Sequence, residues 1–151
     1  MRSGLPFFIA TGCYSGLSPK APGTAGSLAA AVFGTGLLTL SPAVLAPAAL
    51  AATIAGFWAV PFVAEPGQDP GFVVIDEWAG QFLAMAALPH VSFRGVIAAF
   101  ALFRLFDITK PGPIGWADRQ PGAFGIMTDD IFAGAAAAVV ILIIRHFGWL
   151  P

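Results

Sequence analysis

The sequence predicts an all-α membrane protein, a single domain over residues 1–151 built as a bundle of about five transmembrane helices with a polar site at one membrane face. Two observations lead to this prediction. Hydrophobic residues make up 58% of the chain and charged residues only 10%, well below the roughly 25% that is usual in soluble domains. Residues 21–64 contain no Asp, Glu, Lys or Arg, and this stretch is long enough for two helices of about 20 residues, the length that crosses a bilayer.

Five helices are expected along the chain, separated by segments rich in proline, glycine or charge. The Ser41-Pro42 pair is the expected turn between the first two helices. Pro111 ends the fourth, because proline lacks the amide hydrogen that a helix interior needs. Residues 12–23 are expected to form a loop, since glycine, serine and proline are frequent there. The expected helices span residues 24–40, 42–63, 71–88, 92–110 and 131–149.

Charged side chains are concentrated in one part of the chain. Residues 103–130 hold seven of them, out of seven basic and eight acidic residues in total. Five spans that alternate in direction bring every polar cluster to one membrane face. Most basic residues share this face, so the positive-inside rule predicts that it is cytoplasmic. The basic residues expected there are Arg2, Lys20, Arg104, Lys110 and Arg119, against Arg94 and Arg145 on the opposite face.

Five carboxylates are expected to meet at the polar face: Asp76, Glu77, Asp107, Asp129 and Asp130. Carboxylates at membrane depth are costly unless they are paired or bound to metal. Mg²⁺ prefers oxygen ligands and typically combines one or two carboxylates with water and substrate phosphate. The carboxylate group therefore predicts a Mg²⁺ site. Asp129 and Asp130 directly precede the fifth apolar run, where the positive end of a helix favours an acidic residue, but this effect explains one Asp and not all five carboxylates.

Cationic and small residues supply candidate groups for binding phosphate beside the carboxylates. Arg104, Asp107 and Lys110 are spaced three apart, which places them along one side of the fourth helix. Residues 12–27 are rich in glycine and serine and lead into the first helix, whose N-terminal amides form an anion site. The candidate phosphate-binding residues are Arg104, Lys110, Thr24, Ser27, Gly23 and Lys20.

Missing residues exclude several mechanisms. A cysteine phosphatase requires an arginine six residues after its nucleophile, but Pro19 stands at that distance from Cys13. His90 and His146 are both expected on the opposite face, which excludes a histidine nucleophile and a zinc site made of His and Cys. The net charge of -1 argues against a nucleic-acid partner.

Four blocks of the sequence occur in an order that is typical of one known family. They read ATGCYSGLSPKAPGTAGSL (residues 10–28), DEWAG (76–80), FRLFDITKPGPI (103–114) and GAFGIMTDDIFAG (122–134). In these blocks, which are distributed from residue 10 to residue 134, the chain resembles the phosphatidylglycerophosphatase A family. Two positions depart from the family pattern and bear on loop geometry: Tyr14 stands where a glycine is frequent, and Ala123 replaces a second glycine.

The resemblance implies a Mg²⁺-dependent enzyme of the bacterial cytoplasmic (inner) membrane, with its site facing the cytoplasm. Its expected reaction is the hydrolysis of phosphatidylglycerophosphate to phosphatidylglycerol and phosphate in phospholipid biosynthesis. Membrane lipid is the expected environment, and no obligate protein partner is expected. The residues that stand at matching family positions are Glu77, Asp107, Lys110, Asp129, Asp130, Arg104, Thr24 and Ser27.

These residues are compatible with two chemical routes. The metal ligands are expected among Glu77, Asp129, Asp130, Asp107 and Asp76, and the catalytic carboxylates among Asp129, Asp130, Asp107 and Glu77. One carboxylate either activates a water molecule or attacks phosphorus itself. If a covalent intermediate forms, it is expected on Asp129 or Asp130.

Two other functions are compatible with acidic residues in a helical membrane protein. A phosphotransferase that uses CDP-activated lipid also holds acidic metal ligands, but its usual signature of spaced aspartates is missing. A small cation carrier would need carboxylates near the bilayer midplane, whereas these are expected at helix ends on one face.

Overall fold

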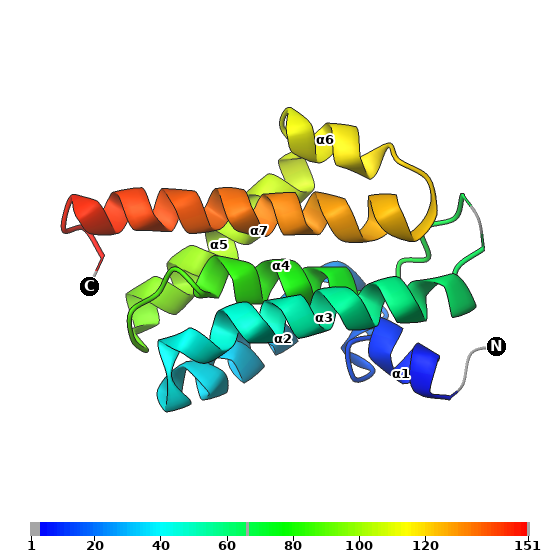
Figure 1. The fold of residues 1–151 in the computed structure, drawn as a ribbon, viewed down its shortest axis with the longest axis horizontal. Coiled ribbons are helices and arrows are strands. Elements are labelled where there is room, and N and C mark those ends of the chain that lie inside the picture. Colours follow the sequence, from blue (N-terminus) through cyan, green and yellow to red (C-terminus); the bar gives the residue numbers. More distant parts are fainter. Residues whose placement is uncertain (1–3, 66, 151) are drawn as a thin grey trace.

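The computed structural model describes residues 4–65 and 67–150, and all the regular structure among them is helical (Figure 1). Arg2, whose expected place is the polar face, lies outside the described residues. The elements in chain order are α1 (Leu5–Ala10), η1 (Ser15–Leu17), α2 (Pro22–Leu40), η2 (Pro42–Val44), α3 (Leu45–Ala59), η3 (Val60–Phe62), α4 (Ile75–Met85), α5 (Phe93–Thr109), α6 (Pro113–Asp118) and α7 (Gly122–His146).

Three segments of the described chain are long and apolar enough to cross a membrane: Pro22–Leu40, Pro42–Phe62 and Gly122–His146. The expected class, an all-α membrane bundle, is confirmed, but the expected count of about five spans is not. The expected third span is helical only over the 11 residues of α4, a length of about 16 Å against a hydrocarbon core of about 30 Å. The 17 residues of α5 include Arg104 and Asp107 near its end.

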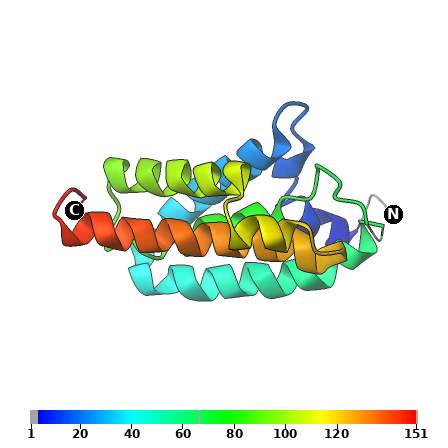
Figure 2. The ribbon, with the colours of Figure 1, turned by 90° about the horizontal axis from the view of Figure 1, so that it is seen from above.

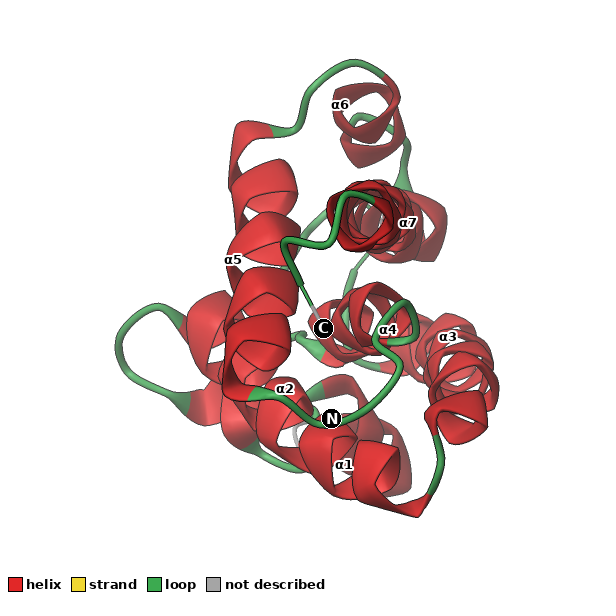
Figure 3. Ribbon diagram, turned by 90° about the vertical axis from the view of Figure 1, so that its left-hand side faces the viewer, coloured by secondary structure: helices red, strands yellow, loops and turns green. Residues whose placement is uncertain are grey.

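Helix α4 lies at the centre of the bundle. It packs against α2, α3, α5 and α7, and the end-on view shows these helices around it (Figure 3). Helix α7 runs between α5 and α3 when it is seen from above (Figure 2). The short α4 is therefore enclosed by protein, which explains how a helix too short to cross the membrane carries Asp76 and Glu77.

Glycine brings the backbones of α4 and α7 into contact. A Cβ atom on Gly134 would lie 2.4 Å from the Gly80 carbonyl oxygen, and a Cβ atom on Gly80 would lie 2.5 Å from the Asp130 carbonyl oxygen. Small residues at such crossings are the usual way in which membrane helices approach closely. This contact fixes the backbone of Asp130 beside the first turns of α4.

The segment before the last span differs from the expected loop. Pro113 begins a short helix, α6, and α7 already begins at Gly122 rather than at residue 131. Asp129 and Asp130 consequently lie about two turns inside α7, whose first turn has no acidic residue. The interpretation of these residues as the start of the fifth helix is therefore wrong, because the Gly-containing segment 122–130 is helical.

The glycine-rich segment before α2 is largely irregular, as expected, with one short turn of η1. Tyr14 has a φ of 68° and lies in the left-handed region that favours glycine. This conformation accounts for the glycine that is frequent at this position in the family resembled. Tyr14 tolerates it at the cost of backbone strain, and its ring contacts Phe8 at a centroid distance of 5.2 Å.

Candidate active site

A cavity of about 300 Å³ opens where the starts of α2, α4 and α7 meet the ends of α5 and α6. All five predicted carboxylates line it, and so do Lys110 and Gly23. The expected convergence of these groups is therefore seen in the fold, although they come from four different helices and the segments between them. The carboxylates on its wall are Asp76, Glu77, Asp107, Asp129 and Asp130, together with Asp69 and Asp118.

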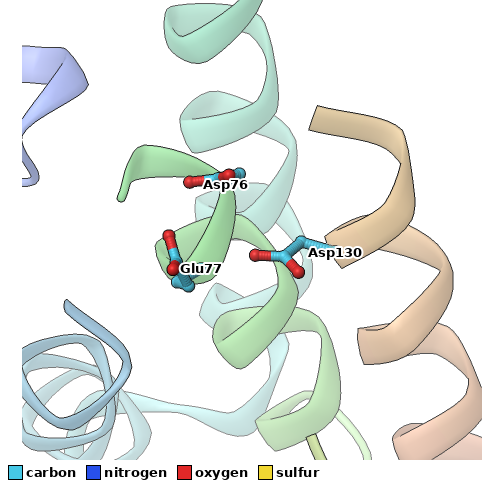
Figure 4. Close-up of side chains that lie close together, drawn as sticks. All are labelled: Asp76, Glu77 and Asp130. Atoms are coloured by element: carbon cyan, nitrogen blue, oxygen red, sulfur yellow. The ribbon is translucent and has the colours of Figure 1, made fainter. Parts of the chain in front are cut away.

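The carboxylates form two groups that share one member. Oxygen atoms of Asp76, Glu77 and Asp130 lie within 4.8 Å of one another, and so do oxygen atoms of Asp107, Asp129 and Asp130. Figure 4 shows Asp76 and Glu77 on α4 with Asp130 reaching toward them from α7. Asp76, Asp129 and Asp130 are only 8%, 5% and 2% exposed.

Several of these oxygen atoms are buried without a hydrogen-bond partner among the described residues. They are Oδ1 of Asp76, Oε2 of Glu77 and Oδ1 of Asp129. A buried carboxylate without a partner costs several kcal/mol, and a bound cation would offset this cost. A hard divalent cation prefers oxygen ligands, so the donor set fits Mg²⁺.

Arg104 links α5 to α2 beside the cavity. It forms an ion pair with Asp107, and its Nη1 and Nη2 atoms lie 3.4 Å from Ser27 Oγ and Thr24 Oγ1. Neither Arg104 nor these two hydroxyl residues line the cavity itself. The structure thus brings three of the predicted phosphate-binding residues together as a neighbouring group, which contacts the cavity wall at Asp107.

Lys110 is the cation on the cavity wall. Its Nζ atom donates to Asp129 Oδ2 at 2.7 Å and also forms an ion pair with Asp118. Burial lowers the pKa of Lys110, but the hydrogen bonds to Asp118 and Asp129 outweigh this effect and raise the pKa above its usual value. Lys110 therefore carries its positive charge throughout the neutral range.

Gly23 and Lys20 differ in their relation to the cavity. A Cβ atom on Gly23 would lie 2.4 Å from Glu77 Oε1, so the absence of a side chain lets Glu77 approach the start of α2. Lys20 is exposed and does not line the cavity. Its carbonyl oxygen accepts a hydrogen bond from Ser18 Oγ, which is a turn contact, and the structure does not bring its side chain to the other predicted residues.

Two acidic residues of the cavity wall were not predicted as site residues. Asp118 ends α6 and pairs with Lys110. Its place in the charged segment 103–130 is the sequence feature that could have identified it as a site residue. Asp69 lies in the loop before α4, and only the polar character of that loop distinguished it.

The known proteins that resemble this chain are named as lipid phosphatases, but their names give two different lipids. The profile of the family described as phosphatidylglycerophosphatase A matches residues 8–145. A Bacteroides thetaiotaomicron protein named "Putative phosphatidylinositol-3-phosphatase" is 42% identical over 149 residues, which cover 93% of this chain and 94% of that protein. Two proteins named phosphatidylglycerophosphatase A are similar: one from Haemophilus influenzae is 41% identical (92% and 88% covered), and one from Escherichia coli is 40% identical (91% and 82% covered). No solved structure matches the chain at a significant level.

Proposed function

Because the chain belongs to the phosphatidylglycerophosphatase A family, we propose that it hydrolyses phosphatidylglycerophosphate to phosphatidylglycerol and phosphate in a Mg²⁺-dependent reaction. In this reaction the bond between phosphorus and the oxygen of the glycerol headgroup breaks, and an oxygen atom from water takes its place on phosphorus. The observation that supports the proposal most directly is the cavity, in which buried carboxylate oxygen atoms without a partner among the described residues lie close to a charged lysine.

The residues that would hold Mg²⁺ are the carboxylates of the cavity wall. When bound, the ion would offset their negative charge and polarise the phosphoryl group. This requirement follows from the substrate, because a phosphomonoester is itself an anion and is repelled by an acidic cavity. The carboxylates would be Glu77, Asp129, Asp130, Asp107 and Asp76.

Lys110 is the group best placed to bind a phosphate oxygen, since it lines the cavity and remains charged. Arg104 is suited to two-pronged contact with phosphate, but it does not line the cavity and is paired with Asp107. Gly23 contributes space at the start of α2, where the amides of the first helical turn favour an anion. Thr24 and Ser27 hold Arg104 in place.

The reacting carboxylate is proposed to be Asp129 or Asp130, acting as a base toward water or as the nucleophile. Both side chains are nearly inaccessible and line the cavity. Substrate labelled with ³²P in its terminal phosphate separates the two routes after an acid quench. Label that stays on the protein and is released by mild alkali indicates an aspartyl phosphate. Protein that stays unlabelled at every quench time within a single turnover favours attack by water.

The proposed location is the bacterial inner membrane, with the cavity on the cytoplasmic side. The three long apolar helices support insertion in a membrane. Figure 1 shows α7 beginning at the end of the bundle opposite the C-terminus, and the described basic residues are more numerous at the cavity end. Maleimide that does not cross membranes should label Lys20→Cys only after lysis of spheroplasts and Gly148→Cys before lysis, both in a Cys13→Ser background.

Phosphate release in detergent micelles tests the activity. Wild type with Mg²⁺ should release phosphate from phosphatidylglycerophosphate, and Asp129→Asn should lose nearly all of this release. The matched control is Glu65→Gln, which removes an exposed carboxylate outside the cavity. Phosphatidylinositol 3-phosphate belongs in the same assay, because a relative of 42% identity bears the name of a phosphatase for that lipid. Faster release from this second lipid would contradict the proposed substrate while keeping the phosphatase reaction.

A further inference from the structure

We propose that the cavity binds two divalent cations of unequal affinity and that Asp130 is a ligand of both. The proposal rests on the proposed function and adds the number of ions, their ligands and their order of binding. The α4 triad consists of Asp76, Glu77 and Asp130, and the α5 triad consists of Asp107, Asp129 and Asp130. Each triad offers three carboxylate oxygen atoms within 4.8 Å of one another, close to the separation of about 4.2 Å across one octahedral Mg²⁺ with ligand distances of about 2.1 Å.

Asp130 can serve two ions because a carboxylate has two oxygen atoms. In two-metal sites the ions lie roughly 3.5–4 Å apart, a spacing that a shared carboxylate spans. The position of Asp130 is fixed by the contact of its carbonyl oxygen with Gly80, since the backbones of α4 and α7 touch there. Its side chain consequently reaches the α4 carboxylates (Figure 4), while the neighbouring Asp129 is turned toward Lys110.

Both triads contain buried oxygen atoms that have no partner among the described residues. In the α4 triad these are Asp76 Oδ1 and Glu77 Oε2, and in the α5 triad it is Asp129 Oδ1. The Asp76 and Asp129 side chains are more than nine-tenths buried and line the cavity. Each triad therefore contains negative charge that no described residue neutralises fully. A single ion bound by one triad would leave the partnerless oxygen atoms of the other triad without a cation.

The two triads differ in their cation partners. Within the described chain, no Lys or Arg forms an ion pair with a member of the α4 triad. In the α5 triad, Asp107 pairs with Arg104 and Asp129 pairs with Lys110. An ion in the α5 triad thus competes with two fixed cations, so the α4 triad should bind first and more tightly.

Mn²⁺ binding to the full-length protein in detergent tests the proposal, with free Mn²⁺ followed by electron paramagnetic resonance. Wild type should bind two Mn²⁺ per chain, with dissociation constants separated by roughly tenfold or more. Asp76→Asn should lose the tighter ion and Asp107→Asn the weaker one, while Glu65→Gln should keep both. A single Mn²⁺ in the wild type, or the loss of both ions in both variants, would overturn the proposal.

Lys110→Gln should increase the affinity for one Mn²⁺ ion, an effect that misfolding would not produce. Removal of the cation beside Asp129 should tighten the weaker Mn²⁺ by roughly tenfold and leave the tighter one unchanged. Equal effects on both ions, or no effect on either, would contradict the assignment of the weaker ion to the α5 triad.

The Mn²⁺ binding data are independent of substrate, so they separate the two-ion proposal from the proposed function. Mg²⁺-dependent phosphate release with one bound Mn²⁺ would overturn only the two-ion proposal, and two bound Mn²⁺ without phosphate release would overturn only the proposed function.

Discussion

The two ends of the bundle differ in how their charged side chains are satisfied. At the end that holds the C-terminus of α7, Arg145 Nη1 donates to the Ala87 carbonyl oxygen at 2.6 Å, and this contact joins α7 to the segment after α4. At the opposite end, carboxylates from three helices converge and leave buried oxygen atoms without partners in the described chain. Arg145 also keeps a buried Nε atom without a partner in the described chain, but its hydrogen bond to the backbone supports the fold. The partnerless carboxylate oxygen atoms at the opposite end lie around one cavity, where they could hold a cation.

The largest effect is expected for Asp130→Asn, because Asp130 belongs to both groups of carboxylates. Phosphate release should fall by roughly 10³-fold or more, the scale seen when a main electrostatic group of an active site is removed. Rates measured at saturating Mg²⁺ test this expectation, with Glu65→Gln as the matched control. A variant that retains a tenth of the wild-type rate would show that Asp130 is not part of the reacting centre.

Gly80→Ala should damage both the fold and the site. Its Cβ atom would lie 2.4 Å from Phe103 Cε2 and 2.5 Å from the Asp130 carbonyl oxygen, so α4 and α7 must separate. Overpacking of this kind costs about 1–3 kcal/mol, and the displaced Asp130 should reduce phosphate release strongly. The apparent melting temperature in detergent and the rate of phosphate release measure the two effects.

Gly36→Ala is the control for Gly80→Ala, because a Cβ atom at Gly36 would meet nothing within 4 Å. Alanine is the better helix former by about 1 kcal/mol, so this variant should melt at the same or a higher temperature and keep its activity. If the two alanine variants behave alike, the contact between α4 and α7 does not position the site.

Gly23→Ala should act on the site with little effect on stability. Its Cβ atom would displace the Glu77 carboxylate, whose Oε1 atom lies 2.4 Å away, and a carboxylate at the end of a side chain can move. We expect the Mg²⁺ concentration for half-maximal activity to rise by roughly 10-fold, in the range found when groups that orient metal ligands are altered. An unchanged Mg²⁺ concentration for half-maximal activity would show that Glu77 does not bind the metal.

Arg145→Gln should show the smallest effect on activity. Loss of the hydrogen bond to Ala87 removes a charge-assisted contact at the far end of the bundle, worth about 1–3 kcal/mol. The apparent melting temperature should fall while the rate per folded molecule stays the same. A loss of activity without a loss of stability would show that the two ends of the bundle are not independent.

The convergence of the carboxylates could be predicted from the sequence because it depends on pattern alone. The expected segment ends that hold residues 76 and 77, 107, and 129 and 130 alternate along an apolar chain. The predicted convergence is seen although Asp129 and Asp130 lie about two turns inside α7. Their separation into two groups could not be predicted, since it depends on the backbone contact between Gly80 and Gly134. The spacing of apolar residues along the sequence does not show which helix backbones touch.

The residues at which the helices near the site begin and end could not be predicted from the sequence pattern either. The segment 122–130 contains glycine and acidic residues and was expected to be a loop, yet α7 includes it because α6 and α4 pack against that part of the helix. Conversely, the expected span 71–88 is helical only over α4. Tertiary packing outweighs local propensity in both cases.

Restoration of phosphate release by Mg²⁺ after metal removal is the decisive test of Mg²⁺-dependent hydrolysis in the acidic cavity. The purified protein in detergent is treated with EDTA, freed of the chelator and assayed with phosphatidylglycerophosphate over a range of Mg²⁺ concentrations. Almost no phosphate should be released before Mg²⁺ is added, and release should recover fully afterwards, because the buried carboxylates repel the substrate phosphate until a cation offsets their charge. Full release by the metal-free protein would show that the reaction does not depend on a bound cation.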